Sequence, residues 1–337
     1  MTLKIAFAGF RHNHIFGLYN LARQRDDLEI VGAAEEDLDT RASLDERADL
    51  AVTHDSVDTM LEDVDCDIVA IGDYYGARGG IAVKALEAGR HVIADKPVCT
   101  SLEELDRIES LCNRTGLRLG CMLDLRDTGA SILTRELVRS GQIGEVRAIQ
   151  FGGQHPLLWG KRPGWYFEKG KHGGTINDIA IHAFDLIPWV TGRAFTRVTA
   201  ARVWNDVAEA PDFQSGAQTM LELDNGAGVL GDVSYHMPDS QGYTLAQYWR
   251  VTFFGEKGLL ESSLRTGPVT LALDGDDCPR PLEVPEPESG RYLQSFVDDI
   301  NGRASDDRLS TETIIEAARK ALKTQKAADE NKGGIEL

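Results

Sequence analysis

The chain has 337 residues, 42% of them hydrophobic and 27% charged, and its formal net charge is −18 at pH 7. This length and composition allow an ordinary buried core and predict two domains. The acidic excess repels phosphate polymers and anionic membrane faces, which argues against nucleic acid and membrane as partners.

The first 122 residues alternate between apolar strands and amphipathic helices. Strands are expected at 3–9, 28–34, 67–72, 91–95 and 117–123, and helices at 14–25, 56–64, 79–89 and 101–116. Nearly all-apolar strands joined by helices predict a parallel, doubly wound α/β sheet covered on both faces, which is the Rossmann arrangement. We therefore expect residues 1–122 to form a dinucleotide-binding domain.

From residue 123 onward the strands become longer and alternate polar with apolar residues. One helix is expected near 130–140, strands at 145–153, 197–205, 217–225, 227–236 and 249–262, a Pro-rich surface connection at 278–290, and a closing helix at about 311–330. Residues 123–337 are predicted to form an α+β domain with an open, mostly antiparallel sheet. Such a sheet leaves one face uncovered, so we expect a homodimer or homotetramer built sheet to sheet.

The turn after the first strand is the expected phosphate-binding loop. It reads GFRHNH, where the dinucleotide fingerprint is GxGxxG, so only the first glycine is retained. That glycine permits a tight turn, and the helix that follows offers backbone amides to a pyrophosphate. In this turn the residues expected to contact the cofactor are Gly9, Phe10, Arg11, His12 and Asn13, with Arg11 pairing with a phosphate. Further along the chain, Asp95 and Lys96 are also expected to contact the cofactor. The alternative is a plain strand-to-helix turn with an exposed arginine.

Two acidic residues, Glu35 and Glu36, stand at the end of the second strand. A carboxylate there accepts hydrogen bonds from the adenosine ribose, and we assign that role to Glu35. Because the carboxylate repels an extra phosphate and no arginine adjoins it in sequence, NAD is favoured over NADP. Asp73, in the loop after the third strand, lies at the same edge of the sheet and adds a further contact. Either glutamate is alternatively a solvated loop charge.

Asp95-Lys96-Pro97 follows the fourth strand, which puts Lys96 at the carboxyl edge of the sheet. In a partly desolvated pocket the charged form of a lysine is disfavoured, so Lys96 is expected to exchange protons near neutral pH. A lysine at a strand end is more often an ordinary surface charge, and this motif alone does not separate the two.

A second cluster of polar residues lies in the segment GGTINDIAIHAFDL. Asp178, His182 and Asp185 are spaced i, i+4 and i+7, which places them on one face of a helix. Metal binding is one interpretation, but no further His or Cys stands at ligand spacing, so we expect no metal. A buried histidine held by a carboxylate is another. Arg126 and Trp165 are candidate substrate contacts in a sugar-shaped pocket, with Tyr166 and His155 nearby.

The two clusters together resemble the Gfo/Idh/MocA oxidoreductase family over nearly the whole chain. The matching elements are Asp95-Lys96-Pro97 and the pattern GGxxxDxxxHxxD from Gly173 to Asp185. The resemblance implies that Lys96 and His182 flank the reacting carbon, while Asp178 fixes the substrate hydroxyl or tunes those two groups. The chain departs from the family pattern at four positions, where it has Arg11, His14, Arg78 and Asp95.

The resemblance implies hydride transfer between the nicotinamide of NAD and a secondary alcohol of a sugar, inositol or related polyol. Either Lys96 or His182 then takes the hydroxyl proton, with Asp178 orienting the acceptor. Two alternatives stay open: an NAD-dependent redox-elimination glycosidase of the same fold, and a non-catalytic dinucleotide-binding sensor.

Cysteine usage and the N-terminal segment bear on where the protein works. The five cysteines are scattered and form no CxxC pair, which is typical of a reducing compartment. The opening MTLKIAFAGF has no basic leader, and no apolar run reaches membrane-spanning length. We expect a cytoplasmic protein.

Overall fold

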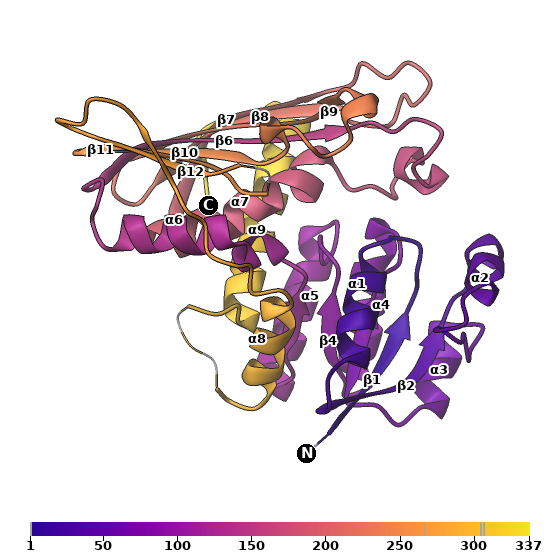
Figure 1. The fold of residues 1–337 in the computed structure, drawn as a ribbon. Helices are drawn as coiled ribbons and strands as arrows, with labels where there is room; N and C mark the ends of the chain where they lie inside the picture. Colours follow the sequence, from indigo (N-terminus) through magenta and orange to yellow (C-terminus); the bar gives the residue numbers. More distant parts are fainter. Residues whose placement is uncertain (1, 266, 304, 306) are drawn as a thin grey trace.

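The computed structural model of the chain describes residues 2–265, 267–303, 305 and 307–337. It contains a five-stranded and a nine-stranded sheet, and the carboxyl ends of the first sheet's strands point toward the helices beneath the second sheet (Figure 1). The predicted α/β fold with a second, open-sheet half is therefore confirmed. None of the helices in the described ranges combines the length and apolarity needed to cross a bilayer.

The first sheet is parallel throughout, in the order β2-β1-β3-β4-β5. Its strands are β1 (Leu3–Ala8), β2 (Leu28–Ala34), β3 (Ile68–Ile71), β4 (His91–Ala94) and β5 (Leu119–Cys121). Its helices are α1 (Ile15–Arg23), α2 (Leu38–Asp45), α3 (Val57–Asp63), α4 (Tyr75–Glu87) and α5 (Leu102–Thr115). β3 and β1 are buried almost throughout because helices cover both faces. Helix α2 was not expected, because its stretch is polar and only Leu44 is buried.

The second sheet has the order β13-β12-β11-β10-β6-β9-β8-β7-β14 among the described residues. The strands are β6 (Val146–Pro156), β7 (Phe195–Trp204), β8 (Gly216–Leu223), β9 (Gly228–Met237), β10 (Arg250–Gly255), β11 (Gly258–Ser263), β12 (Val269–Leu273), β13 (Arg280–Leu282) and β14 (Ile335–Glu336). Every neighbouring pair is antiparallel except β6 and β9, so the predicted pairing is confirmed.

Two details of the second half differ from expectation. Residues 249–262 form the hairpin of β10 and β11 rather than one strand, because the chain reverses between Gly255 and Gly258. The Pro-rich stretch 278–290 contains the short strand β13, which pairs only with β12. Pro281 is tolerated there because an edge strand does not need every backbone donor.

Four helices cover one face of the second sheet or join the two halves: α6 (Gly129–Arg139), α7 (Ile181–Thr191), α8 (Arg291–Ile300) and α9 (Thr311–Asp329). Helix α9 begins with a capping box between Ser310 and Thr313, and it contacts β7 and α7 as well as α5 and β5. In Figure 1 it runs from beneath the second sheet down beside the first. The two halves are therefore packed together rather than merely tethered.

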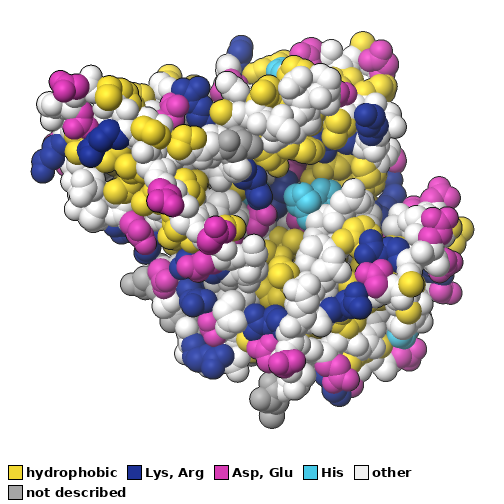
Figure 2. Space-filling view, viewed as in Figure 1, with side chains coloured by type: hydrophobic (Ala, Val, Ile, Leu, Met, Phe, Trp, Pro, Cys, Tyr) yellow, Lys and Arg dark blue, Asp and Glu magenta, His cyan; other side chains and the backbone are white. Residues whose placement is uncertain are grey.

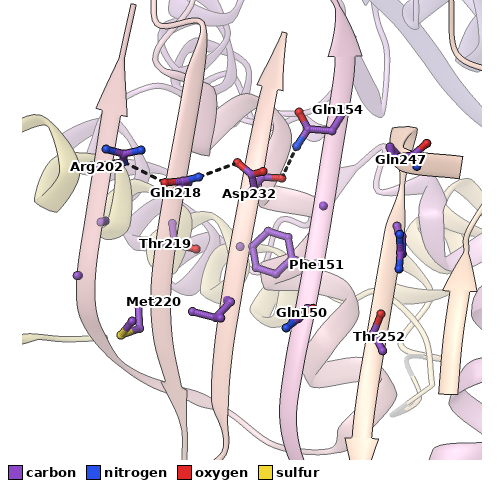
Figure 3. Close-up of a pocket in the computed structure, with 16 residues that line it drawn as sticks. Gln150, Phe151, Gln154, Arg202, Gln218, Thr219, Met220, Asp232, Gln247 and Thr252 are labelled. Atoms are coloured by element: carbon purple, nitrogen blue, oxygen red, sulfur yellow. Dashed lines mark hydrogen bonds between the residues drawn. The ribbon is translucent and has the colours of Figure 1, made fainter. Parts of the chain in front are cut away.

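The other face of the nine-stranded sheet is uncovered in this chain. A shallow cavity of about 720 Å³ on this face is lined by residues of β6 to β10 (Figure 3). Met220 and Leu230 are each 47% exposed on it, although both are large apolar residues. Around them Arg202 donates to Gln218, whose amide in turn donates to Asp232.

Candidate active site

The central ion pair of the site joins the two halves of the molecule. Lys96 follows β4, and its Nζ donates to Asp178 Oδ1 at 2.6 Å and to the Asp178 carbonyl at 3.1 Å. Burial alone would lower the pKa of Lys96, but the Asp178 carboxylate and its neighbours raise it above the usual lysine value. The expectation of a lysine that loses its proton near neutral pH is therefore wrong, because a carboxylate holds the ammonium form in place.

Asp178 is held by two further side chains that the sequence reading had not singled out. The Tyr235 hydroxyl, on β9, donates to Asp178 Oδ2, and His172 Nε2 lies 3.4 Å from the same oxygen. Burial would raise the pKa of Asp178, but Lys96 and His172 hold it well below the usual aspartate value. Asp178 is thus a buried carboxylate with partners on both oxygens, placed to position Lys96.

The segment before α7 is not a plain α-helix. Residues Ile176–Ala180 form a π-helical turn, and the α-helix begins at Ile181. Gly174, with φ of 94°, starts this turn, and a Cβ at that position would lie 2.2 Å from the Gln325 side chain. The prediction that Asp178, His182 and Asp185 share one face assumed regular α-helical spacing, and the π-helical turn departs from it. Asp178 and His182 line the cavity, whereas Asp185 pairs with Arg126.

His182 is a buried imidazole that makes no hydrogen bond to any residue in the described ranges. Its Nδ1 is enclosed without a partner, and its ring packs edge-on against Trp249 at 5.1 Å between centroids. Burial, followed by the Lys96 ammonium, lowers the pKa of His182 to about 3. The ring is therefore neutral at ordinary pH, and its unpartnered nitrogen can accept a hydrogen bond.

Lys96, Asp178 and His182 line one cavity of about 440 Å³ between the two halves. Its other charged or polar lining residues are His12, Asn13, His14, Asp124, His155, Lys161, Arg162 and Arg265. Figure 2 shows histidine and basic side chains at the hollow between the upper and lower parts of the molecule. Of the expected cofactor residues, the structure brings His12, Asn13 and Lys96 into this cavity.

The other expected cofactor residues are buried, except Arg11, which is partly exposed. Gly9, with φ of 78°, makes the tight turn against Asp73, whose Cβ would be 2.7 Å from a Cβ at position 9. Glu35 is 1% exposed, and its oxygens accept from the amides of Phe10 at 2.6 Å and Asp37 at 2.8 Å. Arg11 pairs with Asp37 at 3.3 Å rather than standing free.

An arginine does stand beside the end of β2. Arg41 Nε donates to the Glu35 carbonyl at 3.1 Å, and its guanidinium pairs with Asp55. No arginine adjoins Glu35 in sequence, but helix α2 folds Arg41 back onto the strand end. Three acidic residues, Glu35, Glu36 and Asp37, still surround this position.

An aromatic cluster covers the glycine turn. Tyr75, Trp165 and Tyr166 are all nearly fully buried, and the Trp165 indole donates to the Arg11 carbonyl at 3.1 Å. The Tyr166 and Tyr75 hydroxyls lie 2.9 Å and 3.2 Å from His12 Nε2. Trp165, expected to contact substrate, therefore sits on the turn at which a pyrophosphate would bind, and only Tyr166 of this cluster lines the cavity.

His12, His14 and Asp95 form the group in the described residues whose ligand atoms lie close enough, within 4.8 Å of one another, to hold a metal ion. Asp95 already has a cationic partner, since Arg78 Nη2 donates to its Oδ2 at 3.0 Å and both side chains are fully buried. His12 Nδ1 contacts the same carboxylate oxygen. Arg78 and Asp95 therefore form a buried ion pair, and the Asp95 oxygen that faces His12 is already in use.

Arg126, the other expected substrate contact, is engaged away from the cavity. Its Nε donates to Asp185 Oδ2 at 2.9 Å and its Nη2 to Oδ1, and its guanidinium faces the Trp189 ring. Both charged side chains are buried. This two-point ion pair fixes the turn after β5 to helix α7, which directly follows the π-helical turn.

A parallel sheet with a cavity at its carboxyl edge, closed by residues from a second, open-sheet half, is the arrangement of the dinucleotide-binding class. Two family models match the chain: "Oxidoreductase family, NAD-binding Rossmann fold" over residues 3–122, and "GFO/IDH/MocA C-terminal domain" over residues 132–261. The chain belongs to the Gfo/Idh/MocA family of oxidoreductases.

Several characterised proteins are similar to the chain. A levoglucosan dehydrogenase of Pseudarthrobacter phenanthrenivorans is 28% identical over 52% of this chain and 45% of its own length, so the chain matches less than half of that relative. Inositol 2-dehydrogenase 1 of Paenarthrobacter aurescens is 26% identical over 79% of this chain and 75% of its own. The structure of an inositol dehydrogenase homologue from Azotobacter vinelandii with NAD+ matches at a TM-score of 0.81 and 17% identity, covering 100% and 97%.

Proposed function

We propose that the chain is an NAD-dependent dehydrogenase that oxidises a secondary alcohol of a sugar, inositol or related polyol. The observation that carries the proposal is the meeting of a cation and a neutral imidazole, Lys96 and His182, in one cavity at the carboxyl edge of the parallel sheet. A hydroxyl group in that cavity has a hydrogen-bond donor and a proton acceptor available at once. Dehydrogenases among the relatives act on levoglucosan and inositol by name, which supports the substrate class.

Lys96 and His182 have different roles in the proposed reaction because one is charged and the other is neutral. Lys96 stays an ammonium with three N–H donors, of which Asp178 receives two, and the third is available to a substrate oxygen. We assign the hydroxyl proton to His182, whose unpartnered nitrogen lines the same cavity, while Lys96 stabilises the negative charge that develops on the oxygen. Asp178, with Tyr235 and His172 on its other oxygen, positions Lys96.

NAD is the cofactor that the family implies. The residues expected at its nicotinamide end and those expected at its adenosine end differ in how accessible they are. Asn13, His14 and Lys96 line the cavity and would hold the nicotinamide end. When bound there, nicotinamide supplies the acceptor for the hydride of the carbinol carbon. Glu35 and Asp73 would hold the adenosine end, but protein atoms bury both and Trp165 lies over Arg11.

We favour NAD over NADP because of the charge at the end of β2. Glu35, Glu36 and Asp37 repel a phosphate on the adenosine ribose, while the nearby Arg41 is paired with Asp55.

The test is a spectrophotometric screen of NAD and NADP reduction against a panel of polyols and aldoses. We expect reduction of NAD by at least one cyclic polyol or sugar and a weaker or absent signal with NADP. Turnover of a glycoside without accumulated reduced cofactor would instead assign the redox-elimination reaction. Tight cofactor binding with no turnover on any panel member would contradict the dehydrogenase and favour a sensor.

We also propose that a second copy of the chain covers the open face of the nine-stranded sheet. Support comes from the two half-exposed apolar side chains, Met220 and Leu230, which are cross-strand neighbours on β8 and β9. The test is the molar mass in solution of the wild type and of Leu230→Lys. We expect a dimer or tetramer that dissociates in the variant, and a monomeric wild type would contradict the proposal.

The cellular site that we propose is the cytoplasm. The five cysteines Cys66, Cys99, Cys112, Cys121 and Cys278 are free in the structure, which supports a reducing compartment. Fractionation with a tagged chain tests it, and recovery from an oxidising compartment would contradict it.

A further inference from the structure

We propose that the substrate carries an anionic group, a carboxylate or a phosphate, and that Arg162 receives it with Lys161 at the rim. This inference rests on the proposed function and narrows its substrate class from neutral polyols to acidic ones, such as sugar acids. It comes from the balance of charges in the cavity that holds Lys96 and His182.

The cavity has more cations than carboxylates. Its lining includes the four cationic side chains Lys96, Lys161, Arg162 and Arg265 and the two carboxylates Asp124 and Asp178. Both carboxylates are already paired: Lys96 with Asp178 and Arg265 with Asp124, each at 2.6 Å. Lys161 and Arg162 have no ion-pair partner among the residues that the structure describes. A local positive surplus in a chain of net charge −18 is the opposite of its general surface.

Arg162 is fixed in place without being neutralised. Its Nε donates to the Leu157 carbonyl and its Nη2 to the Pro156 carbonyl, each at 2.9 Å. Its guanidinium lies over the Tyr166 and Tyr235 rings at 4.8 Å and 5.1 Å from their centroids. Nη1 has no partner in the described part of the chain. Nη2 also donates to the Tyr243 hydroxyl at 3.4 Å. A guanidinium that is partly withdrawn from water, held in place, and given only neutral partners is arranged to bind a carboxylate or phosphate.

The place of Arg162 relative to the reacting groups suits this role. Tyr235, under the Arg162 guanidinium, donates to Asp178, and Asp178 holds Lys96. The anionic group and the reacting carbinol therefore bind within one cavity, which His155 also lines with its Nδ1 still unpartnered. Buried polar atoms normally have a hydrogen-bond partner, so the free His155 Nδ1 also favours a polar ligand in this cavity.

The experiment compares matched neutral and acidic substrates, for example glucose with glucuronate and xylose with xylonate. We expect the KM of the better acid to be at least tenfold below that of its neutral partner in the wild type. In Arg162→Gln the KM of the acid should rise about 10- to 100-fold with kcat little changed, while the neutral substrate changes less than about twofold. Arg162→Lys keeps the charge and should recover part of the loss, which separates recognition from misfolding.

Lys169→Gln is the matched control, because Lys169 lies in the same loop, is well exposed and does not line the cavity. Equal KM values for the acid and its neutral partner in the wild type would contradict the anionic substrate. An equal rise in both KM values in Arg162→Gln would contradict it as well. Neither result would contradict the proposed dehydrogenase activity. Calorimetric titration of glucuronate into the protein, without turnover, tests the anion contact by itself. Binding lost in Arg162→Gln supports the inference even if no substrate is oxidised, and binding equal in both proteins overturns it.

Discussion

The two ends of the expected cofactor site differ in one respect: one is an open cavity, and at the other the expected contacts Glu35 and Asp73 are buried. At the Lys96 end, Lys96, Asp178 and His182 line about 440 Å³ of free space. At the Glu35 end, the strand edge that would receive adenosine is buried, and Trp165 rests on the glycine turn. The end that retains the family's chemical residues is the open one, and the end that lost the fingerprint glycines is closed.

In this chain the residues of the chemical site are retained although the glycine fingerprint of the cofactor turn is not. The residues that perform proton transfer are kept together by contacts between the domains, namely Lys96 with Asp178. The residues that would bind the rest of the dinucleotide are occupied by contacts within the chain, namely Glu35 with Phe10 and Arg11 with Asp37. The predictions below test each end in turn.

The largest effect is expected from Lys96→Ala at the open end. Loss of the ammonium removes the donor to the developing oxyanion and leaves Asp178 buried without its cation, so kcat should fall about 10³-fold. Steady-state kinetics measures it, with Lys84→Ala, a half-exposed lysine paired with Asp58, as the control. A variant that turns over at the wild-type rate while still binding cofactor would place the chemistry elsewhere.

His182→Ala should cost about 10²-fold in kcat, because it removes the neutral proton acceptor and leaves the ion pair intact. Since the pKa of His182 is about 3, protonation of this ring should not reduce kcat/KM of the wild type between pH 5 and pH 8. A pH–rate profile measures this directly. An acid limb near pH 6.5 that disappears in the variant would show that the ring is not held neutral as described.

Asp127 lies beneath the open end and tests the cost of burial there. Burial raises the pKa of Asp127 to about 7, and its Oδ1 has no hydrogen-bond partner. The folded protein therefore holds a proton that the unfolded chain releases near pH 4, so stability should fall as pH rises from about 4 to about 7. Asp127→Asn removes that fall and should stabilise the protein by about 2 kcal/mol at pH 8.

Thermal or denaturant unfolding at pH 5 and pH 8 checks this expectation. The gain should be two to three times larger at pH 8 than at pH 5. An equal gain at both values would mean that the carboxyl group is already ionised in the folded protein at pH 5.

The smallest effect is expected from Trp165→Ala at the closed end. Removing the indole uncovers the glycine turn, so the Kd of NAD should fall about tenfold once the cost of displacing the side chain is gone. Calorimetry or fluorescence titration measures it, and Trp159→Ala, a half-exposed tryptophan of the preceding loop, is the control. Weaker binding in Trp165→Ala alone would show that the indole supports the cofactor rather than excluding it.

The strand and helix alternation of the first half and the antiparallel sheet of the second were predictable, because hydrophobic periodicity records which faces are buried. The pairing of Lys96 with Asp178 was not, because it depends on how the two halves pack. Tyr235 was missed because it is one inward-facing residue of an alternating strand, and His172 because it lies outside the spaced pattern that follows it. The burial of Glu35 and the covering of the turn by Trp165 likewise arise from tertiary contacts between distant segments.

The most direct test of the account follows a deuterium label from a polyol that is deuterated at its carbinol carbons and oxidised by the wild-type protein. Mass spectrometry of the recovered nicotinamide cofactor should show deuterium in the reduced cofactor, in an amount equal to the ketone formed, and His182→Ala should lose both signals together. Product formed without deuterium in the cofactor would contradict hydride transfer at the open end.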